Sequence, residues 1–170
     1  MEILGIIPAR GGSKRIPGKN TKLVGGKPLI AWTIEAAKGS KLNRVIVSTD
    51  DPQIVRTAKR YGAEVPFLRP SNLAGDKLGI EPVLIHTLNW LAKEENYRPD
   101  AVALLMPTSP LRQAKHINEA IKIFIKEKPD SVVSVIEARA NQNPYWILKK
   151  NDRNGCVLFT GQPLTEIITR

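Results

Sequence analysis

The sequence has only one cysteine, which excludes an intramolecular disulfide. A lone thiol suits a protein of the reducing cytoplasm. Cys156 is followed by the apolar residues 157–159, and no basic residue adjoins it. We therefore expect Cys156 to pack in a core rather than to act as a nucleophile.

Long apolar runs are also missing. None approaches the roughly 18 residues that a membrane span needs. Met1 and Glu2 are followed directly by a strand-like run, without the charged region and cleavage site of a secretory signal. With 170 residues and 42% hydrophobic content, the chain is large enough for one globular domain with a real core. We expect a cytoplasmic protein with no membrane partner.

The densest chemistry lies in residues 3–20. An apolar run, residues 3–7, ends at Pro8 and leads into a glycine-rich basic segment. A buried strand that runs into such a segment is how α/β proteins build a phosphate cradle, because glycine amides face an anion without a Cβ in the way. We predict a nucleoside triphosphate site here. The alternative is an ordinary surface loop with solvated charges.

Two better-known phosphate motifs are absent. No window matches G-x-x-x-x-G-K-[ST], and G-x-G-x-x-G does not occur either. The segment therefore gives no support to a P-loop or to a nicotinamide or flavin site.

Positive charge is abundant and unevenly distributed. The net charge is +10, and in residues 1–28 six Lys or Arg residues against the single Glu2 leave +5. Half of the excess is thus packed around the predicted cradle. No aromatic residues interleave with these cations, which argues against a base-stacking surface for nucleic acid.

Strand-like and helix-like segments alternate along the chain. We expect strands at 3–7, 44–49, 64–68, 100–106 and 131–136, helices at 28–37, 51–61, 81–93 and 117–126, and one more strand, in a hairpin, at 156–159. The alternation predicts an α/β fold whose mostly parallel sheet is covered by helices on both faces. Pro8, Asp50, Arg69 and Ser109 follow expected strands, and ligands bind beyond the carboxyl ends of such strands, so one crevice can hold all four.

Five ordered segments resemble the acylneuraminate (CMP-sialic acid) cytidylyltransferases. They are Pro-Ala-Arg, Gly-Ser-Lys and Pro-Gly-Lys-Asn within 8–20, Ser-Thr-Asp-Asp at 48–51, Arg-Pro and Leu-Ala within 65–76, Leu-Leu-Met-Pro-Thr-Ser-Pro-Leu-Arg at 104–112, and Ser-Val-Val-Ser-Val at 131–135. The resemblance covers residues 3 to about 150. It implies a three-layer Rossmann-like nucleotide-diphospho-sugar transferase fold, with a nucleotide-binding core in 1–136 and the start of a dimerisation and sugar-side segment in 137–170.

The same resemblance implies a reaction and roles for single residues. CMP would pass from CTP to the anomeric hydroxyl of a nonulosonic sugar acid, with release of pyrophosphate. Arg10 and Lys19 would be catalytic, because this chemistry needs positioning and neutralisation rather than a protein nucleophile. The nucleotide-binding residues would be Ala9, Arg10, Gly11, Gly12, Ser13, Lys14, Lys19, Asn20 (ribose), Arg69 (cytosine) and Asp76. The sugar-binding residues would be Met106, Thr108 and Ser109.

Three places depart from the family's pattern, all on the sugar side or at the edge of the base pocket. Met106 stands where the family usually has Gln, and Met offers no amide donor or acceptor pair. Residues 77–80 follow Asp76 where small residues are usual. Asn-Pro-Tyr-Trp at 143–146 replaces a His-Pro-x-Lys element. We hypothesise that the nucleotide is CTP and that the sugar acid is a nonulosonate other than N-acetylneuraminate.

Metal ligands are not assigned within this sequence. The resemblance implies Mg²⁺ held by an Asp-x-Asp pair C-terminal to residue 170, so the chain is expected to bind nucleotide and to turn over poorly. Asp50 and Asp51 are a weak alternative. His86 and His116 are expected to be structural, with no partner at ligand spacing.

Several alternatives stay open at this point. The enzyme class includes a cytidylyltransferase for an eight-carbon ketosugar acid and other sugar nucleotidyltransferases of the same fold. Outside it stand a basic nucleic-acid-binding module and an inactive, truncated relative. The family resemblance also implies a homodimer through residues 137–170, where the apolar run 145–148 would make the contact or, alternatively, belong to the chain's own core.

Overall fold

The computed structural model describes residues 1–75 and 78–135, and the strands 148–150 and 156–158. The chain forms two compact units, Met1–Val132 and Val133–Arg170, which are described separately. The predicted division into a nucleotide-binding core and a dimerisation segment stays a prediction. No helix of the described part is long and apolar enough to cross a membrane.

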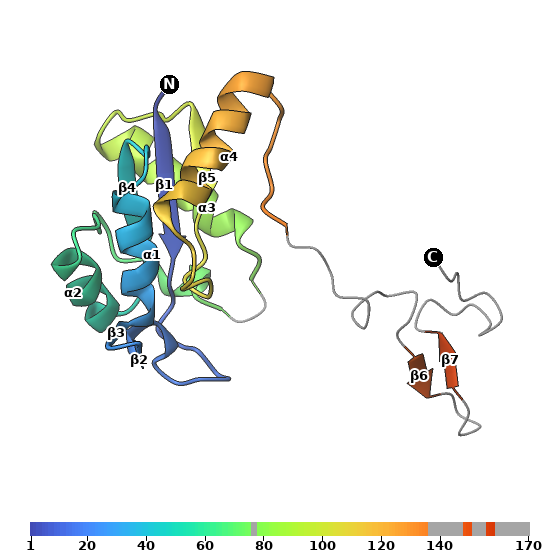
Figure 1. Ribbon diagram of the computed structural model, residues 1–170. Helices are drawn as coiled ribbons and strands as arrows, with labels where there is room; N and C mark the ends of the chain where they lie inside the picture. Colours follow the sequence, from blue (N-terminus) through green and yellow to red (C-terminus); the bar gives the residue numbers. More distant parts are fainter. Residues whose placement is uncertain (76–77, 136–147, 151–155, 159–170) are drawn as a thin grey trace. The chain divides into compact units, whose positions relative to one another are not determined.

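The first unit is built on a parallel sheet of three strands. Strand β1 (Ile3–Pro8) lies in the centre, between β4 (Arg44–Ser48) and β5 (Ala101–Leu104) (Figure 1). Ile6 is in register with Ile46 on one side and with Leu104 on the other. The carboxyl ends of the three strands therefore meet at one edge of the sheet, as the sequence predicts.

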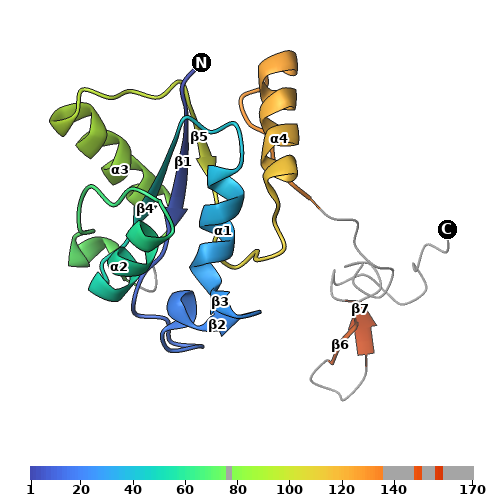
Figure 2. The same cartoon turned by 60° about the vertical axis from the view of Figure 1, so that its left-hand side comes forward.

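Helices cover both faces of this sheet. They are α1 (Leu29–Lys38), α2 (Pro52–Arg60), α3 (Glu81–Glu94) and α4 (Ala114–Glu127). Side chains of β1 alternate between two buried clusters: Ile3 and Ile7 pack with α1, α2 and α4, whereas Leu4 and Ile6 pack with Leu91 of α3. Figure 2 shows α3 on the opposite side of the sheet from α1 and α4. The predicted three-layer α/β architecture is confirmed.

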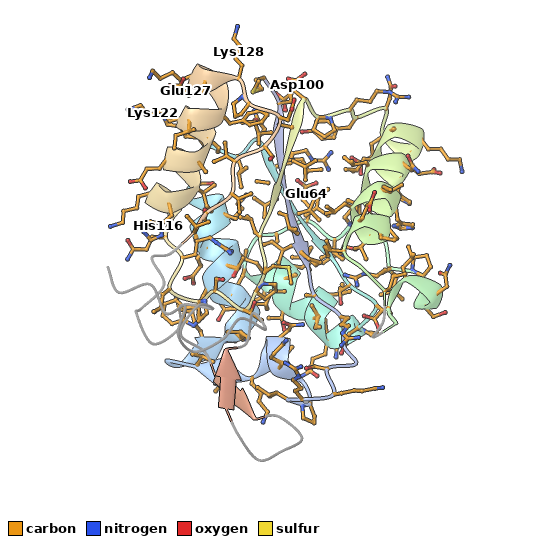
Figure 3. The ribbon with its side chains drawn as sticks, turned by 90° about the vertical axis from the view of Figure 1, so that its right-hand side faces the viewer. Glu64, Asp100, His116, Lys122, Glu127 and Lys128 are labelled. Atoms are coloured by element: carbon orange, nitrogen blue, oxygen red, sulfur yellow. The ribbon has the colours of Figure 1, made fainter. Side chains whose placement is uncertain are left out.

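Local caps set the helix ends. The Asp51 carboxylate accepts hydrogen bonds from the backbone N–H groups of Gln53 at 2.7 Å and Ile54 at 3.4 Å, so α2 begins at Pro52. Helix α4 begins three residues before its expected start, because Gln113 and His116 form a reciprocal cap there. His116 lies at the start of this helix (Figure 3), in the structural role expected for it.

Two of the expected strands are wrong. Within 64–68 there is a single bridge, between Glu64 and Ile46, and Pro66 has no N–H group with which to extend a ladder. Residues 131–135 form no strand: Val133 and Val135 are 75% and 85% exposed. A strand-like sequence becomes a strand only where a neighbour pairs with it. Residue 136 lies outside the described residues.

Small antiparallel elements complete the description. Strands β2 (Leu23–Val24) and β3 (Lys27–Pro28) form a hairpin that we did not predict, across Gly25 and Gly26, whose φ angles are 58° and 85°. In the second unit, β6 (Leu148–Lys150) pairs with β7 (Cys156–Leu158), which confirms the expected hairpin strand.

Acidic residues gather at the amino ends of the strands. Arg44, the first residue of β4, forms ion pairs with Glu64 and with Glu95, the latter at 2.8 Å. The Asp100 carboxylate, just before β5, accepts a hydrogen bond from the Glu2 N–H at 2.6 Å (Figure 3). These carboxylates are thus held at the edge opposite to the basic loop.

Candidate active site

A cleft of about 270 Å³ opens at the carboxyl ends of β1 and β5. Four parts of the first unit line it: the basic loop after β1, the described residues of the segment 69–80 (69–75 and 78–80), the first turn of α3, and the segment after β5. The lining residues are Pro8, Arg10, Ser13, Lys19, Asn20, Arg69, Leu73, Gly75, Leu78, Gly79, Ile80, Val83, Met106, Pro107 and Thr108.

The basic loop closes on itself. Gly18, with a φ of 63°, leads into a single turn of 3-10 helix, η1 (Lys19–Thr21). The buried Asn20 side chain donates from Nδ2 to the carbonyl oxygen of Arg10, at 3.0 Å. This bond holds the two ends of the loop together. As a result, Arg10 and Lys19 both line the same cleft.

The loop is also tied to the end of β4. The Ala9 N–H donates to the Ser48 carbonyl at 2.9 Å, and the Gly11 N–H donates to Oδ1 of Asp50 at 3.0 Å. A Cβ atom on Gly11 would lie 2.6 Å from Oδ2 of Asp51. Only glycine permits this approach without a shift of the neighbouring chain.

Arg69 is the buried cation of the site, with 5% of its surface exposed. Its guanidinium donates to the Ser48 carbonyl and, from Nε at 3.2 Å, to the Ser48 hydroxyl. Burial lowers the pKa of the Arg69 guanidinium, the Asp50 carboxylate opposes that shift, and Arg10 adds to it. Arginine stays charged in proteins, so Arg69 brings a fixed positive charge to the cleft wall.

Most of the predicted site residues come together in this cleft. Seven line it, namely Arg10, Ser13, Lys19, Asn20, Arg69, Met106 and Thr108. Gly11, Gly12 and Lys14 lie on the same loop without being among its lining residues, Ala9 is buried, and Ser109 is exposed beside Thr108. Asp76 lies outside the described residues. The individual roles stay predictions.

The backbone amides of the loop are partly committed. The Gly11 N–H donates to Asp50, and the Ser13 N–H donates to the Gly11 carbonyl at 2.8 Å. In this state of the loop, those two amides point their hydrogen bonds into the protein. Charge for an anion therefore comes chiefly from the side chains of Arg10 and Lys19.

Sequence reasoning missed two parts of the site. One is an apolar wall, formed by Leu73, Leu78, Ile80 and Val83. The other is the support that Ser48 and Asp50 give to Arg69 and Gly11. The second had a visible signal, because the Ser-Thr-Asp-Asp segment follows a predicted strand and its polar side chains reach the same sheet edge as the loop.

The candidate metal ligands have other contacts. Over the described residues there is no group of three or more His, Cys, Asp or Glu side chains that could hold a metal ion. Asp50 accepts from Gly11, and Asp51 caps α2. His86 lies on α3 with its ring edge-on to Phe67, the ring centres 4.9 Å apart.

Comparison with known proteins bears directly on this cleft. A family model described as cytidylyltransferase matches residues 4–152, which includes every residue that lines the cleft. The chain belongs to the cytidylyltransferase family. Its predicted resemblance to the CMP-sialic acid branch of nucleotidyltransferases is confirmed by its relatives.

Three relatives of this cytidylyltransferase chain illustrate the match. It is 48% identical over 147 residues to a CMP-N,N'-diacetyllegionaminic acid synthase of Legionella pneumophila, covering 86% of the chain and 62% of that protein. It is 42% identical over 160 residues to an N-acylneuraminate cytidylyltransferase of Escherichia coli, covering 93% of the chain and 36% of that protein. It is 38% identical over 154 residues to a pseudaminic acid cytidylyltransferase of Campylobacter jejuni, covering 90% of the chain and 66% of that protein. The chain thus spans between about a third and two thirds of these relatives.

Solved structures show the same fold. A cytidylyltransferase from Leptospira borgpetersenii is 28% identical, with a TM-score of 0.57 over 74% of this chain and 49% of that one. A CMP:2-keto-3-deoxy-manno-octonic acid synthetase, solved as a complex with CTP, is 22% identical and has a TM-score of 0.62. The match covers 75% of this chain and 49% of that one. The second likeness is one of fold.

Proposed function

We propose that this chain supplies the nucleotide-binding part of an enzyme that transfers CMP from CTP to a nonulosonic sugar acid. The observation that carries the proposal is the meeting of Arg10, Lys19 and Arg69 in one cleft at the carboxyl ends of the strands. Three cations in one cleft suit a triphosphate, and the family match supports cytosine as the base.

The proposed reaction is an in-line displacement. The anomeric hydroxyl oxygen of the sugar acid forms a bond to the α-phosphorus of CTP and gives up its proton. The bond between the α-phosphorus and the oxygen that bridges it to the β-phosphate breaks, and pyrophosphate leaves. Arg10 and Lys19 neutralise the charge on the phosphates, with Lys19 against the α-phosphate, because positioning and electrostatics dominate this chemistry.

In this proposal the nucleoside and the sugar acid contact different residues of the cleft. Arg69 would contact the cytosine and Asn20 the ribose. Met106, Thr108 and the adjacent Ser109 would face the sugar acid. Met106 lines the cleft, is 41% exposed and has no amide to offer a sugar substituent. We therefore propose a nonulosonate other than N-acetylneuraminate, in line with the synthase of N,N'-diacetyllegionaminate that is 48% identical.

The remaining partners follow from the same family. Members are nucleotidyltransferases, which typically use a divalent metal, and we propose Mg²⁺. Since the described residues do not fit a metal, no step is assigned to it. A homodimer through residues 137–170 is proposed as well, although the side chains of that segment lie outside the described residues. We further propose that the protein works in the cytoplasm and does not bind nucleic acid.

The test separates binding from turnover. Calorimetric titration with CTP, UTP, GTP and ATP is expected to show selective binding of CTP. Pyrophosphate release is then measured with CTP, Mg²⁺ and a panel of N-acetylneuraminate, N,N'-diacetyllegionaminate, pseudaminate and an eight-carbon ketosugar acid. Equal binding of all four nucleotides would overturn the proposal. A clear preference for N-acetylneuraminate would refute the argument from Met106.

Turnover by the chain alone is a separate question. If the metal ligands lie outside residues 1–170, the chain binds CTP and releases little pyrophosphate. Rapid turnover by these residues alone would show that the metal ligands lie within them.

A further inference from the structure

Asp50 is an acidic side chain that contacts the basic loop after β1. It follows β4 after one residue, is half-buried, and accepts the Gly11 N–H at 3.0 Å. The two residues are 39 positions apart in the sequence. Their bond therefore joins the loop after β1 to the end of β4, across the sheet edge where the cleft opens.

The Asp50 carboxylate also acts on the buried cation of the site. Asp50 and Arg10 act on the buried guanidinium of Arg69 in opposite senses, Asp50 stabilising its charge and Arg10 destabilising it. Asp50 thus offsets the repulsion between two cations that the cleft needs close together.

The backbone next to Asp50 is itself held in place by hydrogen bonds. The next residue, Asp51, caps α2 through the Gln53 N–H at 2.7 Å. Its own N–H donates to the buried Thr49 hydroxyl at 3.1 Å. Because its neighbour is held in this way, the Asp50 carboxylate sets the position of the Gly11 amide, rather than the reverse.

We propose that Asp50 is a positioning residue for the phosphate-binding loop: its carboxylate holds the Gly11 amide, and this bond aims Arg10 and Ser13 into the cleft. The proposal rests on the proposed function for its ligand, CTP. It assigns Asp50 neither a contact with the nucleotide nor a metal.

Two variants of equal charge test the proposal. Asp50→Asn and Asp50→Ala both remove the negative charge, but only Asn keeps an acceptor oxygen for the Gly11 N–H. We expect Asp50→Asn to bind CTP at least as tightly as the parent protein, since a negative charge near the phosphates is gone. We expect Asp50→Ala to bind CTP about 5-fold more weakly than Asp50→Asn, the effect of one net hydrogen bond.

Each outcome of the titration decides the matter. The expected order, with similar melting temperatures for both variants, supports positioning by the hydrogen bond. Equal affinities of the two variants would overturn it. An Asp50→Asn protein that binds CTP clearly more weakly than the parent protein would show that the charge itself is needed, as for a metal ligand, and would also overturn it.

A measurement without nucleotide keeps the test independent of the proposed function. In the unmodified protein, amide hydrogen exchange followed by NMR is expected to be slower at Gly11 than at Gly12. The Asp50→Asn protein should keep this protection. Exchange at Gly11 as fast as at Gly12 would overturn the anchor even if CTP binds. Failure to bind CTP with Gly11 protected would count against the proposed function alone.

Discussion

The side chain of Asn20 donates a hydrogen bond to the backbone carbonyl of Arg10 at 3.0 Å, and Asn20 is only 5% exposed. A buried amide that bonds to a loop carbonyl ten residues back serves as a clasp. Its first task is therefore to shape the loop, whatever contact it also makes with a ribose.

Replacing Asn20 should open this clasp. Asn20→Asp is nearly isosteric but has no N–H to donate, so the Arg10 carbonyl loses its partner and a buried charge appears. We expect a loss of about 1–3 kcal/mol in the free energy of unfolding, measured by urea denaturation. The same change at Asn89, exposed on α3, should stay within about 0.5 kcal/mol of the parent protein. Equal effects at both sites would contradict the clasp.

Lys19 and Lys22 form a matched pair for nucleotide binding. Lys19 lines the cleft, whereas Lys22 is exposed and is not among the lining residues. We expect Lys19→Ala to weaken CTP binding by roughly 10- to 100-fold, the effect of a lost charge-assisted contact. Lys22→Ala should change the dissociation constant by less than about 3-fold, because an exposed charge is screened. Calorimetry at fixed ionic strength measures both, and equal losses would show that only the net charge matters.

Gly11 and Gly12 should differ in their tolerance of alanine. A Cβ on Gly11 would lie 2.8 Å from Cβ of Asp51, which is held by its capping bonds, whereas one on Gly12 would meet no described atom within 4 Å. We expect Gly11→Ala to cost about 1–3 kcal/mol of stability through this overlap. Gly12→Ala should leave the melting temperature nearly unchanged. A Gly11→Ala protein as stable as Gly12→Ala would show that the segment yields freely.

His86 should make stability depend on pH. Burial lowers the pKa of the His86 imidazole, and the charge of Arg69 lowers it further. The folded state therefore binds a proton less readily than the unfolded state, whose histidine has a pKa near 6.5. The stability that neutral His86 confers is present above about pH 6.5 and is lost as the pH falls from there toward the lower pKa of the folded state.

The matched variant is His86→Phe, which keeps a ring against Phe67, whose own ring also contacts Trp90. Melting temperatures between pH 5 and pH 8 should fall less steeply on acidification in the variant than in the parent protein. Other titrating groups are shared by both proteins and cancel in the difference. Parallel pH curves would contradict the assignment to His86.

The parts of the fold that sequence patterns predicted are those with a local cause. The apolar run before Pro8, the start of a helix at 51–52 and the helical stripes are each read within a few residues. The meeting of Gly11 with Asp50 is different, because it depends on the parallel register that puts Pro8 opposite Ser48. Burial of Arg69 against Ser48 depends on the same register.

The wrong strands have a related cause. The valines at 133 and 135 have the composition of a strand, but pairing depends on a neighbour that lies elsewhere in the chain. The segment at 64–68 is stopped by Pro66 after a single bridge. The hairpin across Gly25 and Gly26 was missed although its glycine pair was a local signal.

One wall of the cleft comes from residue 8 and another from residue 108. The cavity therefore forms only after the ribosome has translated the chain through β5. A peptide of the basic loop alone does not form this cavity. Binding of a nucleotide in the cleft is then coupled to assembly of the whole parallel sheet. Tight retention of CTP by a nascent or truncated chain would report that the sheet has already assembled.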